Sequence, residues 1–136
     1  MNKVLNQRES ERGSAGVKFA AFMAALLLAA HAGFNYVPVA YDAESLKSDM
    51  STAVVQGLAT PGKLSPADNV KARIVRSAQA NNIPPDFLID VKMAPGNVVT
   101  AHVSYTQPVN ILPFGIYKYN YRFDHTATPT GFLLKQ

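Results

Sequence analysis

The sequence contains no cysteine and no tryptophan. Without cysteine the chain can form neither disulfide bonds nor thiolate metal sites, and this absence fits either side of a membrane. Its 136 residues leave room for one domain. The net charge is +4, but basic and acidic residues are interspersed from Asp42 onward. Because no basic run or stripe occurs there, the composition does not support binding to nucleic acid.

Formal charge is also missing from Phe19 to Tyr41, and the stretch 19–30 is entirely apolar. A helix over residues 18–38 would be about 30 Å long, which is enough to cross the hydrocarbon core of a bilayer. The sequence therefore predicts one transmembrane helix over 18–38. A polar cytoplasmic tail, 1–17, would precede it, and an extracytoplasmic domain, 39–136, would follow.

The charges that flank this segment predict its orientation. Basic residues precede it and acidic residues follow it: Lys3, Arg8, Arg12 and Lys18, then Asp42, Glu44 and Asp49. The positive-inside rule then places the N-terminus in the cytoplasm, and Tyr36 and Tyr41 fit an interfacial aromatic belt. The polar segment from Asn2 to Ser14 is expected to be disordered alone and ordered only by a partner.

A cleaved signal peptide is the main alternative for the same segment. A basic region, an apolar region and Ala30-His31-Ala32 before Gly33 match the pattern of a cleavage site. Cleavage after Ala32 would release a secreted periplasmic binding module. Apolar residues continue beyond that point, which favours a retained anchor: Phe34, Tyr36, Val37 and Val39.

Small residues recur at every fourth position of the predicted span, at Ala21, Ala25, Ala29 and Gly33. This spacing aligns them on one face, where another helix can approach closely. We interpret this ridge as a docking face for a partner's transmembrane helix. The alternative is a ridge that faces lipid, since alanine is common in this chain. His31 and Asn35, also four residues apart, are expected near the outer headgroups.

Two helical patterns and three alternating segments follow. Residues 40–58 carry apolar residues at helical spacing, and Pro38 would kink a continuous helix rather than end it. Ser65, Pro66 and Asp68 predict the start of a second helix that ends near Asn81. Its apolar face would be Val70, Ile74 and Ala78.

Apolar and polar residues alternate over 88–93, 99–105 and 117–124, which is typical of strands with one wet face. We expect the tyrosines of the last segment, including Tyr121, to face the core. The sequence thus predicts an α+β fold: one N-terminal transmembrane helix and a small two-layer domain of about two helices and a three-stranded antiparallel sheet.

The connection 109–115 is unusually apolar for a loop, because Ile111, Leu112 and Phe114 need a place to bury. We expect these side chains to cap the core of the domain. The alternatives are contact with the outer leaflet or with a partner protein. The end of the chain, 131–136, raises the same question.

The sequence predicts no catalytic residues, no cofactor and no metal site. His102 and His125 are candidates for the same side of the sheet as Asp124, but their spacing repeats no metal motif. The sequence lacks both a Gly-x-Ser-x-Gly elbow and a phosphate-binding glycine loop. We therefore expect a protein that is not an enzyme.

Several short motifs occur in order: Arg12-Gly13, Val37-Pro38-Val39-Ala40-Tyr41, Pro113-Phe114-Gly115 and Phe123-Asp124-His125. In this order they resemble a family of uncharacterised bacterial single-span proteins, domain-of-unknown-function family 4845. The resemblance covers nearly the whole chain and implies an inner-membrane protein with a pilin-like layout, without catalytic residues.

A minor pilin is a further alternative, but its leader would need glutamate at the fifth position after the processing glycine. Ala21 and Lys18 stand at that position after Gly16 and Gly13, respectively. The function we expect is therefore a non-catalytic accessory or structural subunit of a larger inner-membrane complex. Its partners would be membrane lipid and the subunits of a photosynthetic, respiratory or secretion complex.

Overall fold

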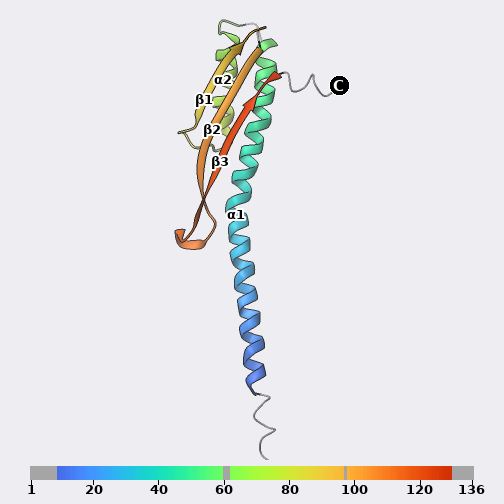
Figure 1. Cartoon of the computed structure of the whole chain (residues 1–136), viewed down its shortest axis with the longest axis vertical. Coiled ribbons are helices and arrows are strands. Elements are labelled where there is room, and N and C mark those ends of the chain that lie inside the picture. Colours follow the sequence, from blue (N-terminus) through green and yellow to red (C-terminus); the bar gives the residue numbers. More distant parts are fainter. Residues whose placement is uncertain (1–8, 60–61, 97, 130–136) are drawn as a thin grey trace, which may run out of the picture.

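The computed structural model describes residues 9–59, 62–96 and 98–129. Along the chain, the helices and strands are α1 (Glu9–Ala59), α2 (Pro66–Ala80), β1 (Leu88–Ala94), β2 (Val98–Asn110), the short 3-10 helix η1 (Pro113–Gly115) and β3 (Lys118–Ala127). Figure 1 shows that α1 extends far beyond the other elements, which gather around its C-terminal half. The expected α+β fold with one long apolar helix is confirmed.

The helix α1 is continuous over 51 residues and passes through Pro38 without ending. At about 1.5 Å per residue it is roughly 75 Å long. Pro38 has no N–H, so it can donate no hydrogen bond to the carbonyl of Phe34, yet the neighbouring turns continue the helix. The helix begins at Glu9, so the end of the segment that was expected to be disordered, from Glu9 to Ser14, is helical. Residues 2–8 of that segment lie outside the described residues.

The second helix begins as its sequence predicts. The hydroxyl of Ser65 accepts a hydrogen bond from the backbone N–H of Asp68 at 3.2 Å, and Pro66 occupies the first turn, where its missing N–H does no harm. The helix ends at Ala80, and Asn81 caps it. Its buried residues are Val70, Ile74 and Ala78, as predicted.

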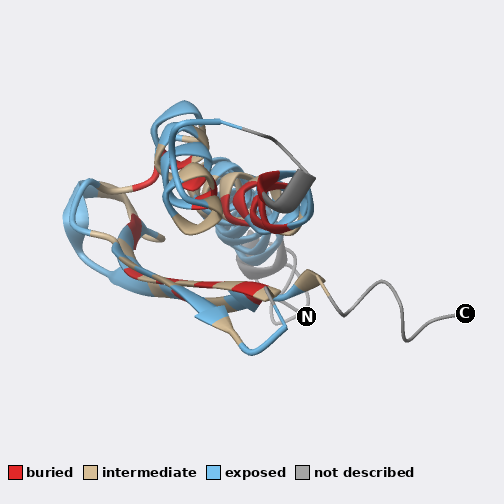
Figure 2. Ribbon diagram, turned by 90° about the horizontal axis from the view of Figure 1, so that it is seen from above, coloured by how far each residue is buried: buried red, intermediate tan, exposed pale blue. Residues whose placement is uncertain are grey.

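The three strands form an antiparallel sheet in the order β1-β2-β3. In Figure 2 both helices lie on one side of this sheet, and the buried residues line the space between the two layers. Helices and sheet share one core, whose residues are Ala43, Leu46, Met50, Ala53, Val54, Val70, Ile74, Ala78, Ile83, Val99, Ala101, Val103, Tyr105, Phe123 and Ala127.

The hairpin between β2 and β3 differs in one respect from the sequence prediction. Val109 and Asn110 belong to β2 rather than to the connection, because they pair with Tyr119 and Lys118 of β3. Val109 is buried. The hairpin is therefore longer than expected, and Figure 1 shows its tip beside α1, well below the rest of the domain. The C-terminal segment 131–136 lies outside the described residues.

Candidate functional site

The N-terminal half of α1 exposes a continuous apolar surface. Every residue from Gly13 to Ala30 is exposed, and the most apolar window of this helix is 0% buried. Soluble monomers rarely expose so large a continuous apolar surface. Among the described residues, α1 is the one helix long and apolar enough to cross a membrane, a property that N-terminal signal sequences share.

The predicted ridge lies on this exposed half. Ala21, Ala25 and Ala29 are exposed and Gly33 is half-buried. A Cβ atom added at Gly33 would meet no described atom within 4 Å. The domain therefore leaves the face around Gly33 open, and a second helix could approach it.

The two polar residues of the segment are paired within the helix. The amide Nδ2 of Asn35 donates to the backbone carbonyl of His31 at 2.9 Å and lies 3.2 Å from Nε2 of the same residue. The hydrogen bond to the carbonyl lowers the cost of placing the Asn35 amide near an apolar phase, because one amide hydrogen already has an acceptor.

Tyr36 joins α1 to the hairpin. Its ring centroid lies 6.2 Å from that of Tyr119 and 5.9 Å from that of Tyr121, in an edge-on arrangement. Such geometries are favourable for aromatic pairs. Burial raises the pKa of Tyr121, with smaller contributions from Tyr36, Glu44 and Tyr119. We call Tyr36, Tyr119 and Tyr121 the tyrosine cluster. Sequence reasoning placed Tyr36 in an interfacial belt and missed its contact with β3.

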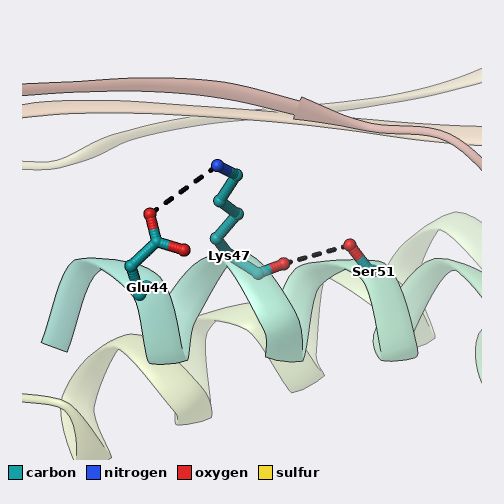
Figure 3. Close-up of polar contacts among 3 residues, drawn as sticks. All are labelled: Glu44, Lys47 and Ser51. Carbon is teal, nitrogen blue, oxygen red and sulfur yellow. Dashed lines mark hydrogen bonds and ion pairs between the residues drawn. The ribbon is translucent and has the colours of Figure 1, made fainter. Parts of the chain in front are cut away.

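The contacts of α1 with β3 continue further along both elements. Figure 3 shows Glu44 and Lys47 on α1, where Lys47 Nζ lies 3.7 Å from Glu44 Oε1. Lys47 also accepts, through its carbonyl, a hydrogen bond of 3.1 Å from the Ser51 hydroxyl. Burial is the main cause that lowers the pKa of His125 on β3; Lys47 lowers it further and Glu44 opposes the shift.

Polar side chains also hold α2 against α1. Ser77 and Asn81 both donate to the carboxylate of Asp49, the latter at 3.2 Å. Arg73 donates to Gln56 Oε1 at 2.9 Å. Because these contacts tie the C-terminal half of α1 to α2, the domain cannot separate from α1 without losing them.

The hairpin tip, residues 111–117, exposes the side chains of Phe114, Ile116 and Tyr117. The backbone N–H groups of Ile111 and Leu112 both donate to the carbonyl of Tyr117, at 3.1 and 3.3 Å. Phe114 adopts a left-handed backbone (φ 62°) and is 98% exposed. The expectation that Phe114 caps the core is therefore wrong: the turn directs its ring into solvent. Ile111 and Leu112 are half-buried but lie outside the core cluster.

The histidines do not form a common site. His102 lies 2.7 Å from Asp124 on the outer face of the sheet, whereas His125 pairs with buried Val103 and lies on the inner face. The prediction of a shared side is wrong for His125, because neighbouring strand residues face opposite ways. Among the described residues, no group of three or more His, Cys, Asp or Glu side chains could hold a metal ion.

One buried polar atom has no partner within the described part of the chain. The Oη atom of Tyr105 makes no hydrogen bond there, while its ring stacks on Phe123 with centroids 4.9 Å apart. Burial, followed by the charges of Tyr121 and Asp42, raises the pKa of Tyr105 to about 12. The hydroxyl is thus protonated at neutral pH and packs as part of the core.

Comparisons with protein-family models, curated proteins and solved structures give no match. The resemblance to the single-span family stays a prediction that rests on the quoted motifs. The apolar half of α1, the tyrosine cluster and the hairpin tip are thus the candidate functional features of this chain.

Proposed function

We propose that this chain is a single-span, non-catalytic accessory subunit of a larger complex in the bacterial inner membrane. Its helix would dock among partner helices, and its domain would cover the periplasmic face. One observation carries the proposal: the helix that exposes an apolar surface from Gly13 to Ala30 also supplies core residues of the domain from Ala43 to Val54.

This continuity favours a positional role. A flexible Gly/Ser-rich linker would let a periplasmic domain sample many orientations. Here the tyrosine cluster and the contacts of α2 with Asp49 hold the domain on the same helix that would enter the bilayer. A domain fixed in this way suits a subunit that clamps or covers the outer face of a neighbour.

The ridge is the proposed contact with that neighbour. Small side chains allow the close helix approach that stabilises association in membranes, where the hydrophobic effect gives no drive. The flanking charges support a cytoplasmic N-terminus. The exposed lipid-compatible faces of α1 support contact with membrane lipid, and the paired amide of Asn35 fits a position near the outer headgroups.

The test is recovery of the C-terminally tagged chain from membranes in mild detergent, followed by mass spectrometry. We expect stoichiometric membrane subunits to be recovered with it. Replacing both Ala25 and Ala29 by leucine should reduce this recovery at least several-fold while leaving the chain in the membrane fraction.

Ala20→Leu with Ala30→Leu is the matched control. At about 100° per residue these two positions face away from Ala25, and both are exposed. Equal recovery with the ridge pair and with this control pair would remove the docking face. Recovery of the chain without any membrane protein would refute the accessory role.

A secreted periplasmic module is the second candidate. It is favoured by the position of the tyrosine cluster, because Tyr36 lies beyond Ala32 and cleavage there would leave that contact intact. A soluble mature chain beginning at Gly33 would establish this candidate, and an intact N-terminal segment would exclude it.

A further inference from the structure

We propose that the hairpin tip is a second membrane contact, which rests in the headgroup–acyl boundary of the outer leaflet beside α1. The inference rests on the proposed function in that α1 crosses the bilayer. Three side chains at the tip are strongly exposed: Phe114 by 98%, Ile116 by 73% and Tyr117 by 53%. Surface loops are ordinarily polar, so an apolar tip of this kind marks an interaction site.

The tyrosine cluster fixes the height of the tip along α1, because Tyr36 lies against Tyr119 and Tyr121. Further along α1 and β3, the charges of Glu44 and Lys47 act on the pKa of His125. The helix α1 and the strand β3 therefore run in the same direction, and the hairpin tip points toward the N-terminus of α1, as Figure 1 also shows. Tyr117 precedes Tyr119 by two strand residues, about 7 Å.

A length of about 7 Å corresponds to roughly four to five helical residues. Counted back from Tyr36, which lies against Tyr119, this places Tyr117 level with residues 31–32 of α1. If the outer headgroups lie level with Asn35, as proposed above, Tyr117 lies about 5 Å inside them. Figure 1 shows η1, which contains Phe114, across the lower end of the hairpin, so Phe114 lies at least as deep as Tyr117. Interfacial segments bury their apolar faces about 5–10 Å into the boundary, so the depth fits a lipid contact.

The chemistry of the tip also fits lipid. Tyr117 and Tyr119 are exposed aromatic residues with a polar end, the type enriched at membrane interfaces. Lys118 packs its stem over the turn, with Cε 3.7 Å from where a Cβ of Gly115 would lie, and its ammonium can extend to the headgroups. The sequence has no acidic residue between Asp90 and Asp124, so no carboxylate opposes anionic lipid.

The backbone of the tip already holds the conformation that presents Phe114 to the membrane. Phe114 holds a left-handed conformation, which is strained for a residue other than glycine. Such strain is typical of functional turns, and here it keeps the ring pointed away from the domain. Because α1 already holds the tip at the bilayer, the second contact needs little additional ordering. Together the two contacts would stop the domain from rotating about the axis of α1.

The absence of cysteine in the natural sequence allows a direct test. Phe114→Cys would be labelled with an environment-sensitive fluorophore, and the full chain reconstituted in phosphatidylcholine–phosphatidylglycerol vesicles. Quenching would be measured with two kinds of lipid: one carries a nitroxide near the headgroup, for positions 114 and 116, and the other carries it near the end of the acyl chain, for position 27 at the middle of the span. Ile116→Cys repeats the measurement at a residue with ordinary helical backbone. Lys92→Cys, on exposed β1, is the matched control, and Leu27→Cys reports on the span.

We expect blue-shifted emission and at least two-fold quenching at positions 114 and 116, with neither effect at 92. Water-like emission at 114 and 116 together with a quenched probe at 27 would overturn the lipid contact and leave the single-span proposal intact. Unquenched emission at 27 would overturn both. A blue shift at 114 that appears only in native membranes, without lipid quenching, would overturn the lipid contact in favour of a protein partner.

Discussion

The helices α1 and α2 pack closely against each other at Gly57. A Cβ atom added there would overlap Cγ2 of Val70 and lie 3.5 Å from the carbonyl oxygen of Pro66. Val70 is fully buried, and a β-branched side chain in a helix has one strongly preferred rotamer. The methyl group therefore cannot turn aside, and Gly57→Ala must push the two helices apart.

The expected magnitude follows from two opposing effects. Overpacking a core costs about 1–3 kcal/mol, and replacing glycine by alanine inside a helix returns about 1 kcal/mol. We expect Gly57→Ala to lower the free energy of unfolding by up to about 2 kcal/mol. For a domain of this size that is a fall of up to roughly 16 °C in Tm, measured by circular dichroism of the full chain in detergent.

Two further variants test whether the loss of stability comes from the contact between Gly57 and Val70. Val70→Ala alone should destabilise through a cavity. Combined with Gly57→Ala, however, it should cost less than the sum of the single changes, by about 0.5–3 kcal/mol. Gly16→Ala is the control without a steric contact, because nothing lies within 4 Å of its added Cβ. A raised Tm for Gly57→Ala, or strictly additive costs, would contradict the close packing of the two helices.

The remaining predictions concern single side chains. Ser65→Ala should lower the free energy of unfolding by about 1 kcal/mol through loss of the α2 cap, and an unchanged denaturant midpoint would contradict it. Tyr105→Phe should be neutral or stabilising by up to about 1 kcal/mol, because it removes a hydroxyl without a partner among the described residues; a clear loss of stability would reveal a hidden acceptor. The same change should remove part of the alkaline instability that sets in above the ordinary tyrosine pKa, since the folded-state pKa is raised to about 12. The folded-state pKa of His125 is lowered, so its contribution to stability is present above the ordinary histidine pKa of about 6.5 and is lost as the pH falls through the folded-state value. His125→Gln should therefore flatten the dependence of Tm on pH between about 7.5 and 5.5, and a parallel curve would contradict the assignment.

The periodic parts of the sequence predicted the fold well. Val70, Ile74 and Ala78 recur at helical spacing and all three are buried, because local periodicity decides which face of a helix meets the core. Ser65 and Pro66 marked the start of α2 for an equally local reason, the satisfaction of free N–H groups. The alternation in β2 likewise placed Val99, Ala101 and Val103 on the buried face.

The features that carry the candidate site were harder to predict, because they depend on residues far apart in the sequence. Tyr36 and Tyr119 belong to segments that no local pattern relates, and only the fold brings them together. The exposure of Phe114 was missed for a similar reason. An apolar loop can bury itself in its own core or in another phase, and its composition is the same in both cases.

The central claim is that one rigid helix joins the apolar segment to the domain across Pro38. It is tested by the distance between spin labels at Leu27→Cys and Ser48→Cys in the reconstituted full chain, measured by double electron–electron resonance. Both positions are exposed on α1. A continuous helix predicts a single narrow distribution centred near 32 Å, from about 1.5 Å per residue, with label flexibility adding a few ångströms. A broad distribution, or a centre well below this value, would mean that the chain bends or breaks at Pro38 and that the domain is not held in position by its span.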